Sequence, residues 1–395
     1  MNCRHCHASL TLPLVDLGSA PPSNAYLTEL TKKAPEKWYP LKVLVCTECW
    51  LVQTEDYAGA EELFDDEYAY FSSFSSSWLT HAEQYVDQMV SRFGLDSTSN
   101  IIEVAANDGY LLQYVKEKNI PCLGIEPTAS TAKAAREKGI EIVEEFFGVD
   151  LASQLVRKGL SADLTVANNV LAHVPDINDF VKGFSVLLQA DGVATFEFPY
   201  LVNLIEKSQF DTIYHEHYSY LSMGSVKTIF EANGLKVFDV ELIKTHGGSL
   251  RVFAERADRT QGRGESASVL DLLKNEISDG YMQQFAYLDF QLIAEKAKDD
   301  LIEFLIKAKK EGKSVCAFGA AAKGNTFMNF AGIGPDLISV VADSNPAKQG
   351  KYMPGSRIPI VSELELSSRK PDYVVILPWN LINEITSRLR FQGRI

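Results

Sequence analysis

From about Asn100 onward, short apolar runs alternate with amphipathic stretches of helical spacing, and this alternation leaves few folds open to the chain. Strands that are buried on both faces read as continuous apolar runs, and helices between them are typical of a parallel sheet. We therefore predict an open parallel α/β sheet in the central part of the chain. Its first four strands are expected at 101–104, 122–125, 164–167 and 193–196.

Two further strands are expected near the end of this region. A helix-like stretch at 225–234 precedes apolar runs at 235–242 and 249–255, which are separated by the hairpin-like connection 244–248. A parallel sheet that ends in an antiparallel pair is the layout of class I methyltransferases. A second α/β unit follows: a long helical pattern at 281–310 precedes expected strands at 315–318, 338–343 and 373–377.

The first predicted strand runs into a turn of small and polar residues, where backbone can approach a ligand. The second ends on an acid, Glu126, whose carboxylate can accept both hydroxyls of a ribose. Together with Glu103 and Asp108, this acid also suits a sulfonium cation. NAD-binding folds share the pattern, but the chain lacks GxGxxG, which disfavours that reading; Glu103 could also be a surface acid. The predicted cofactor-binding residues are Glu103, Ala105, Asn107, Asp108, Gly109, Glu126, Pro127 and Asn168.

Four of the six cysteines form two CxxC pairs near the amino terminus. Each pair can direct two thiolates at one point, and a tetrahedral zinc ion needs four such ligands. A redox pair or disulfides are the alternatives, and a reducing cytoplasm disfavours both. A site filled by four protein ligands has no open position, so this zinc is expected to be structural. The predicted ligands are Cys3, Cys6, Cys46 and Cys49.

A phenol, two imidazoles and a carboxylate occupy positions 214–217. His215 and His217 are two apart, which is wrong for a helix-borne HExxH metal site. On an extended segment they would share a face, so a metal stays open, although no third ligand stands out nearby. Packing of one histidine is a further alternative. General acid and base chemistry suits the group best, because imidazole titrates near neutral pH.

Taken together, these motifs resemble the sugar 3-C-methyltransferases that act on nucleotide-linked 4-keto deoxysugars. The resemblance covers essentially the whole chain, and Ala105 departs from it where the family typically has glycine. It implies three parts: a zinc-binding domain at 1–66, a Rossmann-like methyltransferase domain at 67–256, and a helical spacer with a second Rossmann-like domain at 257–395. The matching segments are the cysteine pairs, 103–109, 126–127, 168–170, 214–217, 246–251 and 319–325.

The resemblance also implies S-adenosylmethionine as cofactor and a mechanism. The 4-keto group acidifies the proton on C3′, His217 removes it, and the enolate carbon takes the methyl group. Tyr214 and Glu216 would position the sugar or move protons, and Asn168 is a further polar contact. His215 is the nearest competitor for the role of base. A nicotinamide-dependent nucleotide-sugar oxidoreductase or epimerase is the alternative function.

Further residues are expected to contact the nucleotide-sugar. Tyr70 lies in an aromatic, hydroxyl-rich segment that could close over a sugar, or else staple two domains together. The turn at 319–324 lacks the GxxxxGK[ST] order, but its backbone amides and nearby basic side chains suit a pyrophosphate, unless those side chains are merely solvated. The predicted substrate-binding residues are Tyr70, Asn169, His215, His246, Arg251, Lys323, Lys351 and Arg357.

Composition limits the partners. The chain has 38 basic and 52 acidic residues, and its net charge of −14 argues against a nucleic acid partner. No apolar run approaches the roughly 18 residues of a membrane span, and the amino terminus lacks a secretion signal, so we expect a cytoplasmic protein. The sequence leaves the choice between monomer and homodimer open.

Overall fold

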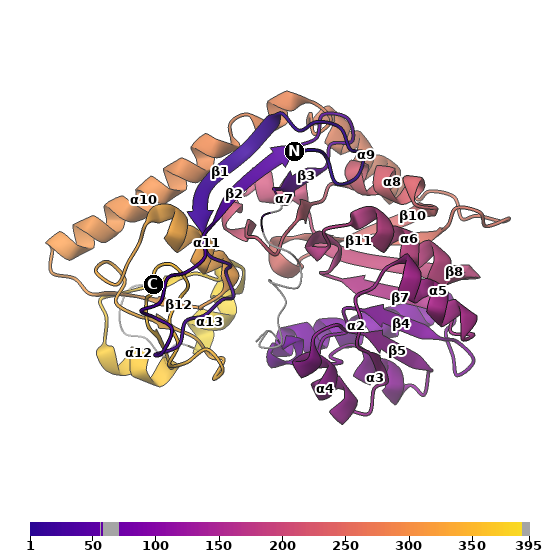
Figure 1. The fold of residues 1–395 in the computed structure, drawn as a ribbon, viewed down its shortest axis with the longest axis horizontal. Helices are drawn as coiled ribbons and strands as arrows, with labels where there is room; N and C mark the ends of the chain where they lie inside the picture. The colour runs from indigo at the N-terminus through magenta and orange to yellow at the C-terminus, as the bar shows by residue number, and fades with distance from the viewer. Residues whose placement is uncertain (56, 58–70, 389–395) are drawn as a thin grey trace.

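The structure, a computed structural model, describes residues 1–55, 57 and 71–388, without the side chains of His246 and Arg388. The chain forms an arch in which the central α/β unit and the carboxyl-terminal α/β unit stand as two lobes (Figure 1). Strands near the amino terminus and the longest helix lie across the top and connect them. Tyr70 and the residues before it, back to 58, lie outside the described part.

The central sheet has seven strands in the order β10-β11-β8-β7-β4-β5-β6. Its strands are parallel except for β11, which is antiparallel to both β8 and β10, as predicted. The carboxyl ends of the parallel strands therefore share one edge, where ligands of open sheets bind. The strands are β4 (Ile101–Val104), β5 (Cys122–Ile125), β6 (Ile142–Val143), β7 (Ala162–Asn168), β8 (Leu188–Pro199), β10 (Leu235–Ile243) and β11 (Ser249–Arg256).

Helices cover both faces of this sheet because neighbouring strand residues point to opposite sides. Ile101 belongs to the apolar cluster under one set of helices, and Ile102 to the cluster under the other. The first set comprises α2 (Ser76–Phe93), α3 (Leu112–Glu117) and α4 (Ala129–Glu137); the second comprises α5 (Val149–Arg157), α6 (Ile177–Leu187) and α8 (Met223–Ala232).

Helix α2 and several short helical segments lie before the sheet or between its strands. Helix α2 begins where the Ser75 hydroxyl caps the amide of Trp78 and ends at Gly94, whose φ of 64° suits glycine. The remaining segments of this region are η1 (Ser72–Phe74), η2 (Leu171–His173), α7 (Leu201–Glu206), η3 (Phe210–Thr212) and η4 (Thr245–Gly247).

The amino-terminal sheet has four strands in the order β1-β2-β3-β9. Three come from the start of the chain: β1 (Leu12–Ala20), β2 (Tyr39–Val45) and β3 (Val52–Thr54). The fourth, β9 (Ser219–Tyr220), directly follows the Tyr-His-Glu-His group and pairs antiparallel with β3. The amino-terminal region and the middle of the chain are thus joined by backbone hydrogen bonds.

The carboxyl-terminal unit has a parallel sheet in the order β14-β13-β12-β15. The predicted helix at 281–310 is shorter in the structure: η5 (Gln284–Tyr287) precedes α10 (Phe290–Lys310), because the backbone is extended at Gln283 and the Tyr287 hydroxyl donates to the Tyr281 carbonyl. The other elements are α9 (Ala267–Ser278), β12 (Val315–Phe318), α11 (Ala322–Ala331), β13 (Val341–Ala342), β14 (Ile360–Val361), α12 (Glu363–Arg369), β15 (Tyr373–Ile376), η6 (Trp379–Leu381) and α13 (Ile382–Arg388).

An early segment of the chain lies against this carboxyl-terminal unit (Figure 1). Leu27 bridges to Tyr352, and the Tyr26 hydroxyl donates to the Ala320 carbonyl at 2.6 Å. The two lobes are therefore tied to the same amino-terminal region. Among the described residues, no helix combines the length and apolar character needed to cross a membrane.

Candidate active site and metal centre

A cavity of about 430 Å³ opens at the carboxyl edge of the central sheet. Its lining includes Asn24 from the amino-terminal region, the ends of β4, β5 and β7, and the start of α11. All three parts of the chain therefore contribute to one site. The sequence-predicted residues in its lining are Ala105, Asn107, Glu126, Pro127, Asn168, Asn169, Tyr214, Glu216, His217 and Lys323.

The turn after β4 forms one end of this cavity. Ala105 and Asn107 have φ of 60° and 50°, so the chain turns tightly here. The Asn107 amide donates to Glu126 Oε2 at 2.9 Å, while Oε1 accepts from the Thr128 amide at 3.0 Å. Burial raises the pKa of Glu126. A carboxylate at this strand end can accept ribose hydroxyls.

Three predicted cofactor residues lie behind this surface rather than in it. Asp108 accepts a hydrogen bond from the Ser73 amide at 3.3 Å and pairs with Lys138 at 3.6 Å. Gly109 packs so closely that a Cβ there would lie 2.4 Å from Ile140 Cδ1. Glu103 is fully buried, and burial raises the pKa of its carboxyl well above the ordinary value. These three shape the turn from the inside.

His217 and Tyr214 form a hydrogen-bonded pair in the middle of the cavity. His217 Nδ1 lies 2.7 Å from the carbonyl oxygen of Thr212, which can only accept, so Nδ1 carries the hydrogen. In the neutral imidazole Nε2 then has the lone pair, to which the Tyr214 hydroxyl can donate at 2.7 Å. This tautomer presents its basic nitrogen to the Tyr214 hydroxyl, and both residues line the cavity.

Glu216 lies beside this pair with its side chain almost wholly buried. Its Oε1 accepts from Asn24 Nδ2 at 3.2 Å, and Oε2 has no hydrogen-bond partner among the described residues. Burial raises the pKa of this carboxyl to about 7, although the hydrogen bond from Asn24 opposes the shift. The group can therefore hold or release a proton near neutral pH.

Sequence reasoning missed His173, which also lines the cavity. Its Nδ1 donates to the Glu216 carbonyl at 2.8 Å, and its ring lies edge-on to that of His217 with centroids 4.6 Å apart. Burial lowers its pKa to about 4, so it stays neutral. Its position five residues after Asn168, at the carboxyl end of β7, was the signal that could have identified it.

Two predicted substrate residues lie elsewhere. His215 is not part of the cavity lining, and its Nε2 donates to the carbonyl oxygens of Tyr39 and Pro40, each at 3.2 Å. Arg251 is buried within the central domain, where it pairs with Glu197 at 3.2 Å and with Glu241 at 3.1 Å. Both side chains hold parts of the structure together. The side chain of His246 lies outside the described part.

Two cationic side chains, Lys323 and Lys348, line the same cavity. Lys323, at the start of α11, lies over the Trp379 ring, and Asp211 accepts from Trp379 Nε1 at 2.8 Å. Burial lowers the pKa of Lys323 and raises that of Asp211. Lys348 belongs to the basic stretch 348–351, although it was not among the predicted contact residues; it also lines the cavity and donates to the Ala320 carbonyl at 2.8 Å.

Lys351 and Arg357 are not in the cavity lining. Arg357 pairs with Glu36 at 2.9 Å and donates to the Ala34 carbonyl, so it fastens the amino-terminal segment to the carboxyl-terminal unit. Of the basic residues Lys348, Lys351 and Arg357, only Lys348 therefore brings its charge to the cavity.

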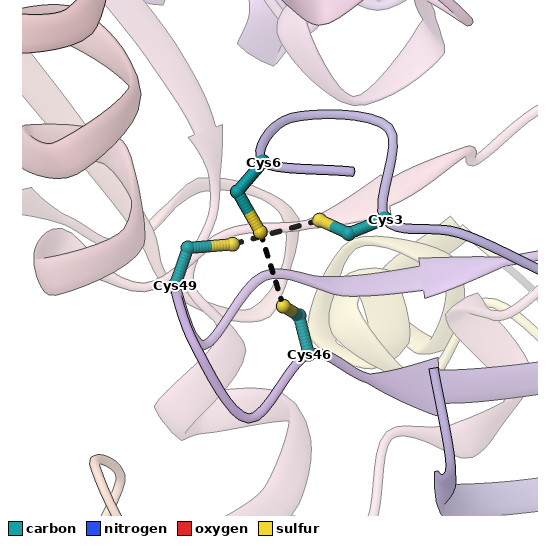
Figure 2. Close-up of side chains that lie close together, drawn as sticks. All are labelled: Cys3, Cys6, Cys46 and Cys49. Carbon is teal, nitrogen blue, oxygen red and sulfur yellow. Dashed lines mark hydrogen bonds between the residues drawn. The ribbon is translucent and has the colours of Figure 1, made fainter. Parts of the chain in front are cut away.

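The four amino-terminal cysteines converge in one cluster. Their sulfurs point toward a common centre from the loop at the amino terminus and the loop after β2 (Figure 2). All four lie within 4.8 Å of one another, and the pairs Cys3–Cys49 and Cys6–Cys46 are 3.5 and 3.4 Å apart. Zinc–sulfur bonds of about 2.3 Å require sulfurs roughly 3.8 Å apart, so the cluster fits a tetrahedral zinc ion.

Comparison with known proteins places each part in a family. Family models match as a putative zinc binding domain over residues 3–64, a methyltransferase domain over 78–240 and a C-methyltransferase C-terminal domain over 244–393. C-methyltransferase NovU of Streptomyces niveus is 34% identical over 383 residues, which are 97% of this chain and 90% of that protein.

Among solved structures, magnesium protoporphyrin IX methyltransferase of Synechocystis PCC 6803 with bound SAM is 14% identical. It aligns with 46% of this chain and 81% of its own, with a TM-score of 0.34. The PH0226 protein of Pyrococcus horikoshii OT3 is 12% identical and aligns with 48% of this chain and 95% of its own, with a TM-score of 0.39.

The chain belongs to the C-methyltransferase family that combines these three domains. It is an S-adenosylmethionine-dependent C-methyltransferase with a zinc-binding module at its amino terminus. The predictions of fold class, family, enzyme class and cofactors are confirmed. The alternative of a nicotinamide-dependent oxidoreductase receives no support.

Proposed function

We propose that the enzyme methylates C3′ of a nucleotide-linked 4-keto deoxysugar through an enolate. The observation that carries this proposal is the single cavity of about 430 Å³ that joins the cofactor turn, the His217 pair and two cationic side chains. These three features suit a methyl donor, a reacting carbon and a diphosphate. The volume is that of a ligand site of ordinary size.

S-adenosylmethionine, when bound, supplies an electrophilic methyl group on sulfur. The base removes the C3′ proton of the substrate. The electron pair left on C3′ then forms the new C–CH₃ bond. The bonding pair of the broken S–CH₃ bond stays on sulfur. The adjacent 4-keto group makes the first step accessible, because its oxygen takes up the negative charge of the enolate.

We assign the base to His217. Its Nδ1 is held as a donor by Thr212, so a proton from the substrate can be accepted at Nε2. His215 is the weaker candidate, because it lies outside the cavity lining and bonds to Tyr39 and Pro40. Tyr214 donates to the same Nε2, so its hydroxyl either passes the proton on or turns to the enolate oxygen.

Glu216 and the two cationic side chains complete the assignment. A carboxyl with a pKa of about 7 can take the proton from the cavity and return it to solvent after each turnover. Lys323 and Lys348 supply two positive charges for the two negative charges of a nucleoside diphosphate link. The amino-terminal end of α11 also favours an anion there, since Ala321 and Ala322 line the cavity.

The test is incubation with S-adenosylmethionine and a panel of nucleotide-linked 4-keto deoxysugars in deuterated water. The proposal predicts a methyl group at C3′ of at least one panel member, with His217→Asn retaining cofactor binding and losing turnover. Exchange of the C3′ proton for deuterium, measured without the methyl donor, reports on the base alone. If the zinc-loaded enzyme methylates no sugar carbon, or if His217→Asn turns over normally, the proposal is wrong.

A further inference from the structure

The zinc-binding module holds the backbone at His217 and at the residues that follow it. Strand β3 pairs with β9, where Gln53 is opposite Ser219. The next residue, Thr54, donates its hydroxyl to the His217 carbonyl at 3.2 Å and its amide to the Tyr218 carbonyl at 3.1 Å. The placement of the proposed base therefore depends on a strand from the metal-binding module.

Gln53 connects this strand to the cysteine cluster. Its side chain is fully buried, and Nε2 donates to Cys3 Sγ at 3.2 Å and to the Leu51 carbonyl at 3.4 Å. Its Oε1 accepts from the Arg4 amide at 2.9 Å. One residue thus contacts a metal ligand through its side chain and adjoins the residue that contacts His217.

Arg4, which lies between Cys3 and Cys6, makes a second connection. Its guanidinium donates to the carbonyl oxygens of Thr54 at 2.9 Å and Pro175 at 3.1 Å, and it lies over the Tyr218 ring. The two bonds attach the first cysteine loop to β3 and to the loop after η2, and the ring contact attaches it to Tyr218, which follows His217. The loop, β3 and the segment that carries His217 are therefore in mutual contact.

We propose that Gln53 is a positioning residue, which seats the zinc-binding loop on β3 and thereby holds His217 against Thr212 and Tyr214. This inference rests on the proposed role of His217 as base. A buried donor that meets a thiolate makes a charge-assisted bond, and its loss leaves the strand free to shift relative to the loop. A shift of about 1 Å at a reacting group costs on the order of 100-fold in rate.

The test uses Gln53→Leu in the full-length enzyme, with Gln291→Leu as its control. Gln291 accepts from the Asp16 amide at 2.7 Å on β1, at the other edge of the same sheet, so the control also removes an amide contact with a strand. For Gln53→Leu we expect zinc content and KM for S-adenosylmethionine to be unchanged, and kcat to fall roughly 10- to 100-fold. The control should keep kcat within about twofold, since surface changes have small effects.

Nitrogen-15 spectra of the histidine rings give a readout that does not depend on catalysis. In the unaltered enzyme, His217, assigned with His217→Asn, should show hydrogen on Nδ1 and a lone pair on Nε2. Gln53→Leu should broaden or shift this signal, whereas Gln291→Leu should leave it alone. An unchanged signal together with unchanged kcat overturns the proposal for Gln53, whatever role His217 has.

Should Gln53→Leu lose zinc, Thr54→Val decides the question. This variant leaves the bond from Gln53 to Cys3 in place and removes only the hydroxyl that donates to the His217 carbonyl. A displaced His217 signal in zinc-loaded Thr54→Val supports the connection through β3, and an undisturbed signal refutes it. Failure of the proposed function would instead appear as normal turnover in His217→Asn. That result would not change how the ring signals of the other variants are read.

Discussion

The hydroxyl of Tyr214 donates to Nε2 of His217 over 2.7 Å, and this bond makes the phenol and the imidazole act as one group. The opposite ring nitrogen is engaged by the Thr212 carbonyl, also at 2.7 Å. The imidazole can therefore neither rotate nor change tautomer without breaking one of the two bonds. The ring of the base is therefore fixed before it accepts a proton, and only the Tyr214 hydroxyl has to pass that proton on or turn away from Nε2.

Loss of the phenol should slow the reaction without weakening cofactor binding. For Tyr214→Phe we expect kcat to fall roughly 10²-fold, and for His217→Asn roughly 10³-fold or more, the range of general acid and base catalysis. The double variant should be little worse than His217→Asn, because the two groups act together. Steady-state kinetics measure all three, and additive losses would argue against a shared function.

His215→Asn is the matched control for the histidine pair. Its ring bonds to the backbone of Tyr39 and Pro40, outside the cavity, so turnover should stay within a few-fold of the unaltered enzyme. A thermal melt should show the loss instead, by about 1 kcal/mol, because the partly exposed carbonyl oxygens of Tyr39 and Pro40 lose a donor. A loss of turnover in the properly folded variant would return the role of base to His215.

Glu216 should make the folded protein less stable as pH rises. Its pKa lies at about 7 in the folded protein and near 4.5 when exposed, so the folded state binds the additional proton between these values. Stability from this group is therefore greatest below pH 4.5 and is lost by about pH 7. Glu216→Gln removes the effect, so its melting temperature should exceed that of the unaltered enzyme by a margin that grows from pH 5 to pH 8.

The difference in stability between Glu216→Gln and the unaltered enzyme has an upper limit. At about 1.36 kcal/mol per pH unit, the shift of Glu216 corresponds to about 3 kcal/mol. The amide of the variant can still accept from Asn24, so that contact is preserved. Paired melts at pH 5, 6.5 and 8 isolate Glu216 from the other buried acids, whose contributions cancel in the difference. A margin that shrinks toward pH 8 would contradict the raised pKa.

Substrate affinity should depend on Lys323 and not on Lys351. Lys323→Met removes a charge that lines the cavity, and a charge-assisted bond is worth roughly 1.5 to 3 kcal/mol. We expect KM for the nucleotide-sugar to rise about 10- to 100-fold while KM for S-adenosylmethionine holds. Lys351→Met removes the same charge outside the cavity and serves as the control. Equal effects of the two substitutions would mean that the diphosphate lies elsewhere.

Zinc should be required for the folded amino-terminal region. Cys46 is fully buried, and Cys46→Ser removes one of four converging ligands, so metal content and melting temperature should both fall. Cys316→Ser, a buried thiol of the carboxyl-terminal unit, is the control and should keep zinc. Atomic absorption on the purified proteins measures the metal. A full zinc complement in Cys46→Ser would exclude the four-cysteine site.

The fold was largely predictable because its signals are local. Buried parallel strands such as β4 and β5 require continuous apolar runs, and the two CxxC pairs specify a metal site through spacing alone. Helix α10 was predicted too long. The hydrogen bond from Tyr287 to Tyr281, which lies just before this helix, leaves no pattern in the sequence.

The site was predictable where residues follow strand ends or gather in one short segment, as at 214–217. Glu126 and Asn168 could be placed from the parallel sheet, but Asn24 reaches Glu216 across 192 positions of sequence. Arg251 appeared available for substrate until the register of β11 and β8 set it opposite Glu197. Lys348 and Lys351 differ by three positions in one basic cluster, and only the path of the loop decides which of them lines the cavity.

The cofactor turn should tolerate glycine at one position and reject alanine at another. Ala105 has a φ of 60°, a conformation that costs an L-residue roughly 1 to 2 kcal/mol, so Ala105→Gly should be neutral or stabilise by up to about 1 kcal/mol. Gly109 has a φ of 73°, and an added Cβ would meet Ile140 Cδ1 at 2.4 Å. Gly109→Ala should therefore destabilise by about 2 kcal/mol or more and weaken S-adenosylmethionine binding, since the same turn lines the cavity. Thermal melts and titration with the cofactor measure both quantities, and a stable Gly109→Ala variant with unaltered affinity would show that the turn does not need its present path.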